Sequence, residues 1–235
     1  MSLIELNQVS KIYDETIVPI RAVDNVNLKI GKGEFTSIVG PSGSGKTTML
    51  NLIGGLDQPT EGKIIVDGTD ISTYKPDALI NFRLHHIGFV FQAYNLIPVF
   101  TAKENVEFIM LLQNIPKSER EKRAVEFLEA VGLKDRINST PAELSGGQQQ
   151  RVAVARALAS QPSFVLADEP TANLDSVSAE SLLDLMEDLN HKHNMTFVFS
   201  THDQRVIKRA HRIVTLQDGK IKKDEMNPAH AKSEA

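Results

Sequence analysis

Residues 35–53, FTSIVGPSGSGKTTMLNLI, decide the fold. The first five residues are mostly apolar and favour a strand, the glycine-rich run GPSGSGKT follows at 40–47, and the rest favour a helix that ends at Gly54-Gly55. A strand, a glycine loop and a helix in this order are typical of a phosphate-binding loop. The stretch therefore predicts a nucleotide-binding α/β core.

The glycine-rich run matches the pattern G-x-x-x-x-G-K-[ST], in which the backbone wraps phosphate groups. Lys46 supplies a positive charge to the β and γ phosphate oxygens, and Thr47 offers a hydroxyl to Mg²⁺. The residues that we expect to bind the nucleotide here are Gly40, Pro41, Ser42, Gly43, Ser44, Gly45, Lys46, Thr47 and Thr48.

The composition is that of an ordinary globular protein. The chain has 235 residues, with 41% apolar and 24% charged residues. Its net charge of −4 gives no electrostatic reason to expect nucleic acid as a partner. Cysteine is absent, which excludes disulfides and thiolate metal sites. Apolar runs such as 108–112 fall far short of the ~20 residues that span a bilayer, so we expect any membrane contact to run through a partner.

Strand signals dominate the first part of the chain. Apolar positions in short runs or in alternation predict an antiparallel β layer packed beside the nucleotide core, formed by residues 3–13, 21–30, 33–40 and 62–72. From about residue 94 to 160 the pattern becomes helical. There Ala124, Phe127, Leu128 and Val131 share one face of an amphipathic helix.

The last third returns to alternating strands and helices. Residues 163–169 and 196–202 are continuous apolar runs joined by a helical segment, which favours buried parallel strands. Asp218-Gly219 predicts a terminal hairpin. We expect a single domain over residues 1–235. Its core and β layer cover about 1–93 and 161–222, a helical subdomain covers about 94–160, and a flexible tail covers about 223–235.

Several polar residues follow apolar runs, and the carboxyl ends of parallel strands are where α/β sheets bind ligands. Asp168 is placed to hold Mg²⁺, and Glu169 to orient or deprotonate the attacking water; the alternative is an acidic helix cap. His202 can donate to a γ-phosphate or serve as a structural histidine. Gln92 can bind Mg²⁺ or hold water, unless it is a buried polar cap.

A second glycine-containing helix start lies about a hundred residues after the first, in ELSGGQQQRVAVARA at 143–157. Ser145 can be a plain N-cap, but the two glycines leave the backbone open, and a helix N-terminus favours phosphate. Tyr13 can stack on adenine or take part in ordinary packing.

Taken together, these residues resemble the nucleotide-binding subunits of ABC transporters over nearly the whole chain. The family's motifs occur in the family's order: Tyr13 as the adenine-stacking aromatic, GPSGSGKT as Walker A, Gln92 as the Q-loop glutamine, LSGGQ at 144–148 as the signature, FVLADE at 164–169 as Walker B, ANLD at 172–175 with Asp175 as the D-loop, and His202 as the switch histidine.

The resemblance implies an α/β fold, with a P-loop NTPase (RecA-like) core, an N-terminal antiparallel β subdomain and an inserted α-helical signature subdomain. It implies ATP and Mg²⁺ as ligands and hydrolysis of ATP, with Glu169 and His202 as catalytic residues and Thr47, Gln92 and Asp168 at the metal. It also implies a head-to-tail dimer. In that dimer Ser145, Gly146, Gly147 and Gln148 serve the ATP of the second copy.

The expected partners are therefore a second copy of the chain and integral membrane permease subunits, on the cytoplasmic face of the cell membrane. Residues 55–64, 91–107 and 166–175 are most similar to the lipoprotein-release and macrolide-export group. Apolar residues of the segment after Gln92 can dock on the permease or belong to the subdomain core: Leu96, Ile97, Val99 and Phe100. The alternative function is a soluble ABC ATPase of the iron–sulfur cluster assembly type.

Overall fold

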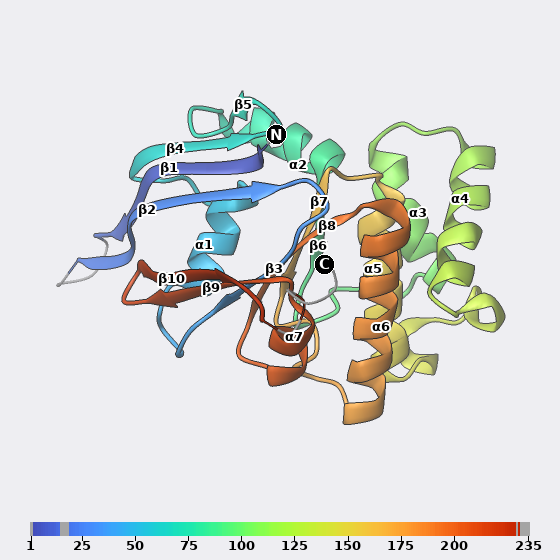
Figure 1. The fold of residues 1–235 in the computed structure, drawn as a ribbon. Helices are drawn as coiled ribbons and strands as arrows, with labels where there is room; N and C mark the ends of the chain where they lie inside the picture. The colour runs from blue at the N-terminus through green and yellow to red at the C-terminus, as the bar shows by residue number, and fades with distance from the viewer. Residues whose placement is uncertain (1, 15–18, 229, 231–235) are drawn as a thin grey trace.

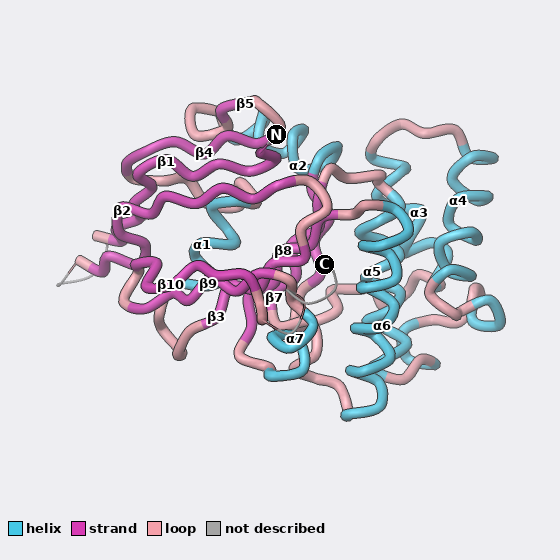
Figure 2. The backbone as a smooth tube through the Cα atoms, in the orientation of Figure 1, coloured by secondary structure: helices cyan, strands magenta, loops and turns pink. Residues whose placement is uncertain are grey.

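Two β-sheets form one side of the molecule and a group of helices forms the other (Figure 1). The computed structural model describes residues 2–14, 19–228 and 230. Figure 2 shows the strands gathered on one side and the helices α3 (Ala102–Leu112), α4 (Lys117–Ala130), α5 (Gly146–Ala159) and α6 (Ser176–His193) on the other. Short 3₁₀ helices at Lys134–Arg136 and Pro141–Glu143 connect α4 to α5.

The larger sheet has six strands and carries the phosphate-binding loop. In order across the sheet they are β10 (Lys220–Met226), β9 (Arg212–Gln217), β3 (Phe35–Val39), β8 (Thr196–Thr201), β7 (Phe164–Asp168) and β6 (Ile87–Val90). All neighbouring pairs are parallel except β9 with β10. The two predicted parallel strands and the predicted terminal hairpin are confirmed.

The prediction that residues 33–40 belong to the antiparallel layer is wrong for β3. This strand pairs in parallel with both β8 and β9, in the middle of the larger sheet. Phe35, Thr36, Ser37 and Ile38 are all buried, because helices or the second sheet cover both faces. A run of buried residues without alternation is typical of a central parallel strand.

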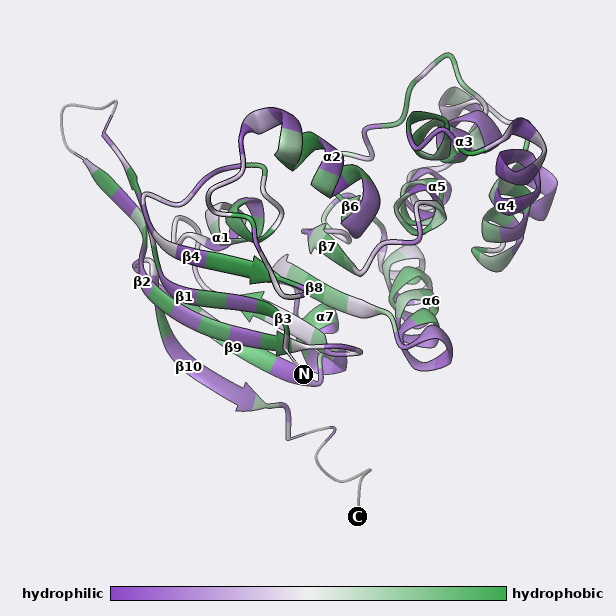
Figure 3. Ribbon diagram, turned by 90° about the horizontal axis from the view of Figure 1, so that it is seen from above, coloured by the Kyte–Doolittle hydropathy of each residue, from purple (hydrophilic) through white to green (hydrophobic). Residues whose placement is uncertain are grey.

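The smaller sheet is the expected antiparallel layer. It contains β2 (Ile20–Gly31), β1 (Ser2–Tyr13), β4 (Glu61–Val66) and β5 (Thr69–Asp70), in that order. The hydropathy colours alternate along β1 and β2 in Figure 3, as they should for strands with one buried face. That face shares a core with α1 (Lys46–Ile53), where Met49, Leu52 and Ile53 are fully buried.

Helix α1 begins directly after the glycine loop and ends where the sequence predicts. The Gly54 N–H donates to the Leu50 carbonyl oxygen at 2.8 Å, and Gly55 follows in the left-handed region at φ +60°. Two of the described helices were not predicted. Helix α2 (Pro76–His86) buries only Leu79 and Phe82 and therefore has a weak apolar pattern, and α7 (Gln204–Arg209) is only six residues long.

The helices α3 to α6 share one hydrophobic core with the larger sheet. Ala124, Leu128 and Val131 are buried and Phe127 packs against them, as the amphipathic pattern of this helix predicts. The same core includes Val152 of α5 and Val165 of β7. In the part of the chain that the structure describes, no helix combines the length and the apolar character needed to cross a bilayer.

The ordered chain continues past residue 223, where the flexible tail was predicted to begin. Strand β10 runs to Met226, and Asn227 is buried, with its side-chain amide donating to the Ala210 carbonyl oxygen at 2.7 Å. The start of the tail is therefore placed too early by the sequence, because charged residues such as those of β10 can also form an edge strand. The short helix α7 (Gln204–Arg209) lies beside this contact. Residues 229 and 231–235 lie outside the described residues.

Candidate active site

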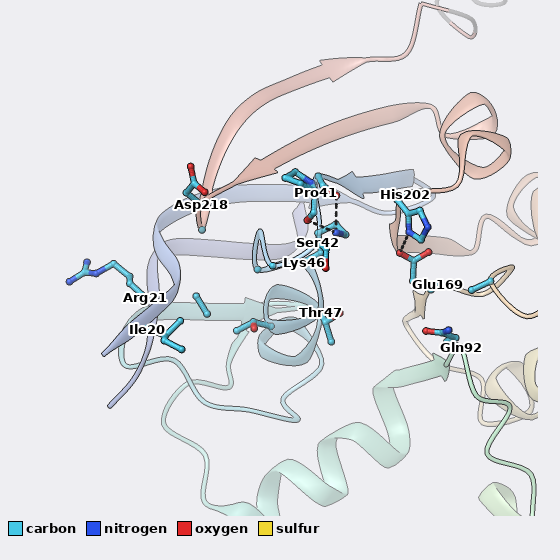
Figure 4. A pocket seen from close by; sticks show the side chains of 17 residues that line it. Ile20, Arg21, Pro41, Ser42, Lys46, Thr47, Gln92, Glu169, His202 and Asp218 are labelled. Atoms are coloured by element: carbon cyan, nitrogen blue, oxygen red, sulfur yellow. Dashed lines mark hydrogen bonds and ion pairs between the residues drawn. The ribbon is translucent and has the colours of Figure 1, made fainter. Parts of the chain in front are cut away.

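A cavity of about 770 Å³ opens over the glycine loop (Figure 4). It is lined by most of the residues that the sequence predicts for the nucleotide: Gly40, Pro41, Ser42, Gly43, Gly45, Lys46, Thr47, Thr48, Gln92, Glu169 and His202. The other lining residues are Ala172, which begins the ANLD stretch, and five residues from β2 and the β9–β10 turn: Ile20, Arg21, Ala22, Asp218 and Gly219. Because these last residues carry no motif, the sequence did not point to them.

The loop packs tightly against the antiparallel layer. Gly45 has φ +101°, and a Cβ at this position would lie 2.1 Å from the Ala22 carbonyl oxygen, so no other residue fits there without movement. The Lys46 Nζ donates to the carbonyl oxygens of Gly40 (2.9 Å) and Pro41 (3.0 Å). The ammonium group therefore lies against its own loop, next to free space that a phosphate can fill at the N-terminus of α1.

Glu169 follows β7 and lies beside the end of β8. It is held with φ +46°, an uncommon backbone conformation for glutamate, and its N–H donates to the Ser200 carbonyl oxygen at 2.9 Å. Its two carboxylate oxygens have different partners. The Thr201 hydroxyl donates to Oε2 at 2.9 Å, and His202 Nδ1 lies 2.6 Å from Oε1.

His202 is much more exposed than Glu169, with side-chain exposures of 76% and 16%. Its ring can therefore reach a ligand in the cavity while it contacts the carboxylate, as Figure 4 shows. The buried Thr201 was not predicted as a site residue. The only available signal was a hydroxyl one residue before His202, at the end of a predicted strand.

Thr47 in the first turn of α1 lies close to Asp168 at the carboxyl end of β7. The Thr47 hydroxyl is 3.4 Å from Asp168 Oδ1 and donates to it, although the two residues are 121 positions apart. Gln92, at the end of the neighbouring β6, lines the cavity. These hydroxyl, carboxylate and amide oxygens are the donors that Mg²⁺ prefers.

Ser44 and Tyr13, two of the predicted nucleotide-binding residues that precede the signature, are not among the described lining residues of the cavity. Ser44 is buried under the loop, where a Cβ at Gly40 would lie 2.7 Å from its Oγ. Tyr13 donates its hydroxyl to Asp57 Oδ2 at 2.8 Å, and the Lys11 Nζ lies 5.0 Å from its ring centroid. The adenine-stacking role of Tyr13 stays a prediction.

The LSGGQ stretch forms the start of α5, and the N-cap interpretation of Ser145 is confirmed. The Ser145 hydroxyl accepts from the Gln148 N–H at 3.3 Å, and Gln148 Oε1 accepts from the Ser145 N–H at 2.9 Å. Asp175 is the N-cap of α6 and accepts from the Val177 and Ser178 backbone. Neither Asp175 nor any residue of 145–148 is among the lining residues described for the cavity.

Gln150 connects the signature helix to the cavity. It is fully buried, and its Nε2 donates to the carbonyl oxygens of Phe91 (3.2 Å) and Pro170 (2.9 Å). Phe91 precedes Gln92 and Pro170 follows Glu169, so one amide ties the start of α5 to both strand ends. In the sequence Gln150 is only the last of three consecutive glutamines, two residues after the signature, and it was not singled out.

This arrangement defines the class of the protein. A phosphate loop between a central parallel strand and a helix, with a paired carboxylate and histidine at the same sheet edge, belongs to a P-loop nucleotide hydrolase. The family of ABC transporters matches residues 23–172, and the chain belongs to this family. It is an ATP-binding cassette and an ATPase.

Similar proteins agree with this assignment. An uncharacterized ABC transporter ATP-binding protein of Thermotoga maritima is 48% identical, covering 93% of each chain. The MacB macrolide export ATP-binding/permease protein of Hyphomonas neptunium is 46% identical over 99% of this chain, which spans about a third (36%) of that relative's length.

Among solved structures, the ATP-binding cassette MJ0796 of Methanocaldococcus jannaschii, a dimer bound to ADP and Pi, has a TM-score of 0.87. It is 46% identical, and the match covers 95% of this chain and 98% of that chain. These relatives support a transport role over the iron–sulfur assembly alternative.

Proposed function

We propose that two copies of this chain pack head to tail and enclose ATP between them, with the loop of residues 40–47 from one copy and residues 145–148 from the other. The observation that carries the proposal is the separation of these two elements. Ser145 is exposed at the N-terminus of α5 and lies outside the described lining of the cavity. The MJ0796 cassette is a dimer bound to ADP and Pi, which supports a nucleotide-bound dimer of this chain as well.

Within this dimer, Lys46 and the amides of the loop hold the phosphates, and Glu169 takes the proton of the attacking water. Thr201 and His202 orient the carboxylate of Glu169 through the contacts described above. Thr47, Asp168 and Gln92 would hold Mg²⁺, which neutralises charge on the phosphates. The ring of Tyr13 would stack on the adenine base of ATP.

The proposed dimer drives a membrane permease, from the cytoplasmic face of the membrane. MacB-type relatives are named as combined ATP-binding and permease proteins for macrolide export, which supports an export role of this type. Val99 is 79% exposed, and we assign it to the permease-docking surface with its neighbours Ile97 and Phe100. Leu96 is partly buried and packs against the hydrophobic core, which favours the alternative interpretation for this residue. We also propose helical-subdomain boundaries near residues 94 and 160.

The variant Glu169→Gln tests this function. We expect turnover to fall roughly 10²- to 10⁴-fold, because a general base is removed, which corresponds to about 3 to 5 kcal/mol in the barrier. Nucleotide binding should survive. Light scattering with ATP should then show twice the 26.0 kDa mass of the chain.

A double variant, Glu169→Gln with Ser145→Asp, is the matched control. The added carboxylate would face the phosphates of the second copy, so this protein should stay monomeric with ATP. A strictly monomeric Glu169→Gln protein at high concentration would contradict the proposed dimer, and near-normal turnover would remove Glu169 from the role of base.

A further inference from the structure

Three potential metal ligands meet near the amino-terminal end of β3, whereas the glycine loop and the nucleotide cavity follow the carboxyl end of that strand. Glu187 and His191 lie one turn apart in the last part of α6, and His211 lies between α7 and β9. One donor atom from each residue lies within 4.8 Å of the others. His191 Nε2 is 4.0 Å from Glu187 Oε1. None of the three is among the described lining residues of the cavity.

The surrounding residues restrict the His211 ring. Its backbone N–H donates to the Phe35 carbonyl oxygen at 2.8 Å, which fixes the chain at this point. Its ring centroid lies 5.8 Å from that of Phe35, 5.6 Å from that of His191 and 4.8 Å from that of His230. One imidazole is therefore held in place by packing, while the His191 side chain is 60% exposed and can turn toward it.

The charge around the cluster favours a cation. Arg209 pairs with three carboxylates of α6, Glu180, Asp184 and Glu187, so this group carries net negative charge. The Arg209 contact also holds Glu187 Oε2 at 3.1 Å, leaving Oε1 directed at His191. In addition, the C-terminal end of a helix carries partial negative charge.

We propose that Glu187, His191 and His211 bind one first-row divalent transition-metal ion of the Zn²⁺ type. Two imidazole nitrogens and a carboxylate oxygen are a donor set that suits Zn²⁺, whereas Mg²⁺ prefers oxygen ligands alone. Ligands about 2.1 Å from a tetrahedral ion lie roughly 3.4 Å apart. The present spread of up to 4.8 Å is wider than this, and a small movement of the side chains, of which only His191 is exposed, would close it.

The ion would join the end of α6 to the segment that enters β9. Both elements follow catalytic parts of the chain, since α6 follows Glu169 and Asp175, and the α7–β9 segment follows His202. An ion that binds only the folded chain stabilises the fold. The proposal therefore assigns a structural metal site near the amino-terminal end of β3, at the end of the strand opposite the glycine loop.

Equilibrium dialysis of the untagged, nucleotide-free protein against Zn²⁺ tests the proposal. We expect one tightly bound Zn²⁺ per chain and a rise in melting temperature on Zn²⁺ addition, with no comparable effect of Mg²⁺. The variant His191→Ala should bind Zn²⁺ at least about tenfold more weakly, because loss of even an outer-shell partner costs 10- to 100-fold. It should fold normally, since this side chain is mostly exposed.

The matched control is His193→Ala, two residues further along α6, which should keep the wild-type affinity and the same rise in melting temperature. A second control, His202→Ala, should also keep the wild-type Zn²⁺ affinity and the rise in melting temperature. Equal Zn²⁺ affinity in the wild type and in His191→Ala would overturn the proposal. Loss of binding in His202→Ala would also overturn it, because the ion would then sit at the nucleotide site.

Discussion

The Thr201 hydroxyl illustrates how a single residue can position a catalytic group. It donates to Glu169 Oε2 at 2.9 Å and accepts from the Asp203 N–H at 3.0 Å, and its side chain is fully buried. It therefore fixes one oxygen of the proposed base while His202 contacts the other. Thr201 is a positioning residue in this arrangement.

We expect Thr201→Val to lower kcat by roughly tenfold, about 1.4 kcal/mol in the barrier, because the carboxylate loses one of its two orienting partners. The KM for ATP should change little, since Thr201 does not line the described cavity. Steady-state kinetics checks both values. Thr201→Ser keeps a hydroxyl and should restore kcat; a Thr201→Ser protein as slow as Thr201→Val would contradict a positioning role.

Asp203, next to His202, makes the stability of the fold depend on pH. Partial burial alone would raise the pKa of its carboxyl, but hydrogen bonds from Arg205 and Thr171 lower the pKa from the ordinary 3.8 to about 2. Because the pKa is lowered in the folded state, the Asp203 carboxylate stabilises the fold at pH values above its ordinary pKa. This contribution is lost as the pH falls toward 2.

Asp203→Asn should therefore lower the free energy of unfolding at neutral pH by roughly 1 kcal/mol, as many single substitutions do, and the urea midpoint should fall accordingly. The difference from the wild type should shrink as pH falls below about 4. Urea unfolding at a series of pH values measures this. A difference between the two proteins that grows on acidification would show that Asp203 is not stabilising as the carboxylate.

At the scale of elements, Ser145 at the start of α5 has two roles, one in the helix and one in the proposed dimer. Ser145 caps the helix in this chain, and we propose that it meets the nucleotide of the second copy. The cap and the ligand contact need different chemistry. Aspartate is as good an N-cap as serine, but its negative charge repels phosphate.

We expect Ser145→Ala to lower stability by about 0.5 to 2 kcal/mol through loss of the cap. Ser145→Asp should keep wild-type stability and lose ATP-driven dimerisation. Thr101 caps α3 with a capping box of the same kind, so Thr101→Ala is the matched control and should lose similar stability while ATP-driven dimerisation is kept. Thermal melts and light scattering separate the two roles, and a Ser145→Asp protein that dimerises normally would argue against the shared site.

Gln150 shows a connection between elements that the sequence did not indicate. Its amide reaches the ends of two strands from the side of α5, across 59 positions of sequence to Phe91 and 20 to Pro170. Such a contact depends on how a helix packs against a sheet, and neither local propensity nor spacing specifies it.

At the scale of the whole molecule, the proposed shared site predicts complementation between two inactive chains. Lys46→Ala damages the phosphate loop, and Ser145→Asp damages the contact to the second copy. In a mixed dimer, one site then combines an intact loop with an intact signature, and the other site carries both substitutions. Each variant alone has no intact site.

We expect each variant alone to be nearly inactive and an equal mixture to recover at most about half of the wild-type ATPase rate, the value reached when every dimer is mixed, since each mixed dimer has one intact site out of two. A phosphate-release assay over a range of mixing ratios measures the recovery. A mixture no faster than the separate variants would contradict a site built from two chains.

Much of the fold followed from short-range patterns. The glycine loop and α1, the strands β7 and β8, and the terminal hairpin are each specified by neighbouring residues, so they were predicted. Strand β3 was assigned to the wrong sheet, and the helices α2 and α7 were missed. In both cases the deciding factor was which faces become buried, and distant parts of the chain determine that.

The sequence by itself determined the phosphate loop, the nucleotide-binding core and the residue types at the site, because backbone freedom at glycines and the chemistry of Lys46, Glu169 and His202 are local properties. Only the tertiary structure decided that Thr201 holds Glu169, that Gln150 joins α5 to two strand ends, and that His211 meets Glu187 and His191. The physical reason is that parallel strands and packed helices bring together residues far apart in the chain, at distances that no local pattern encodes.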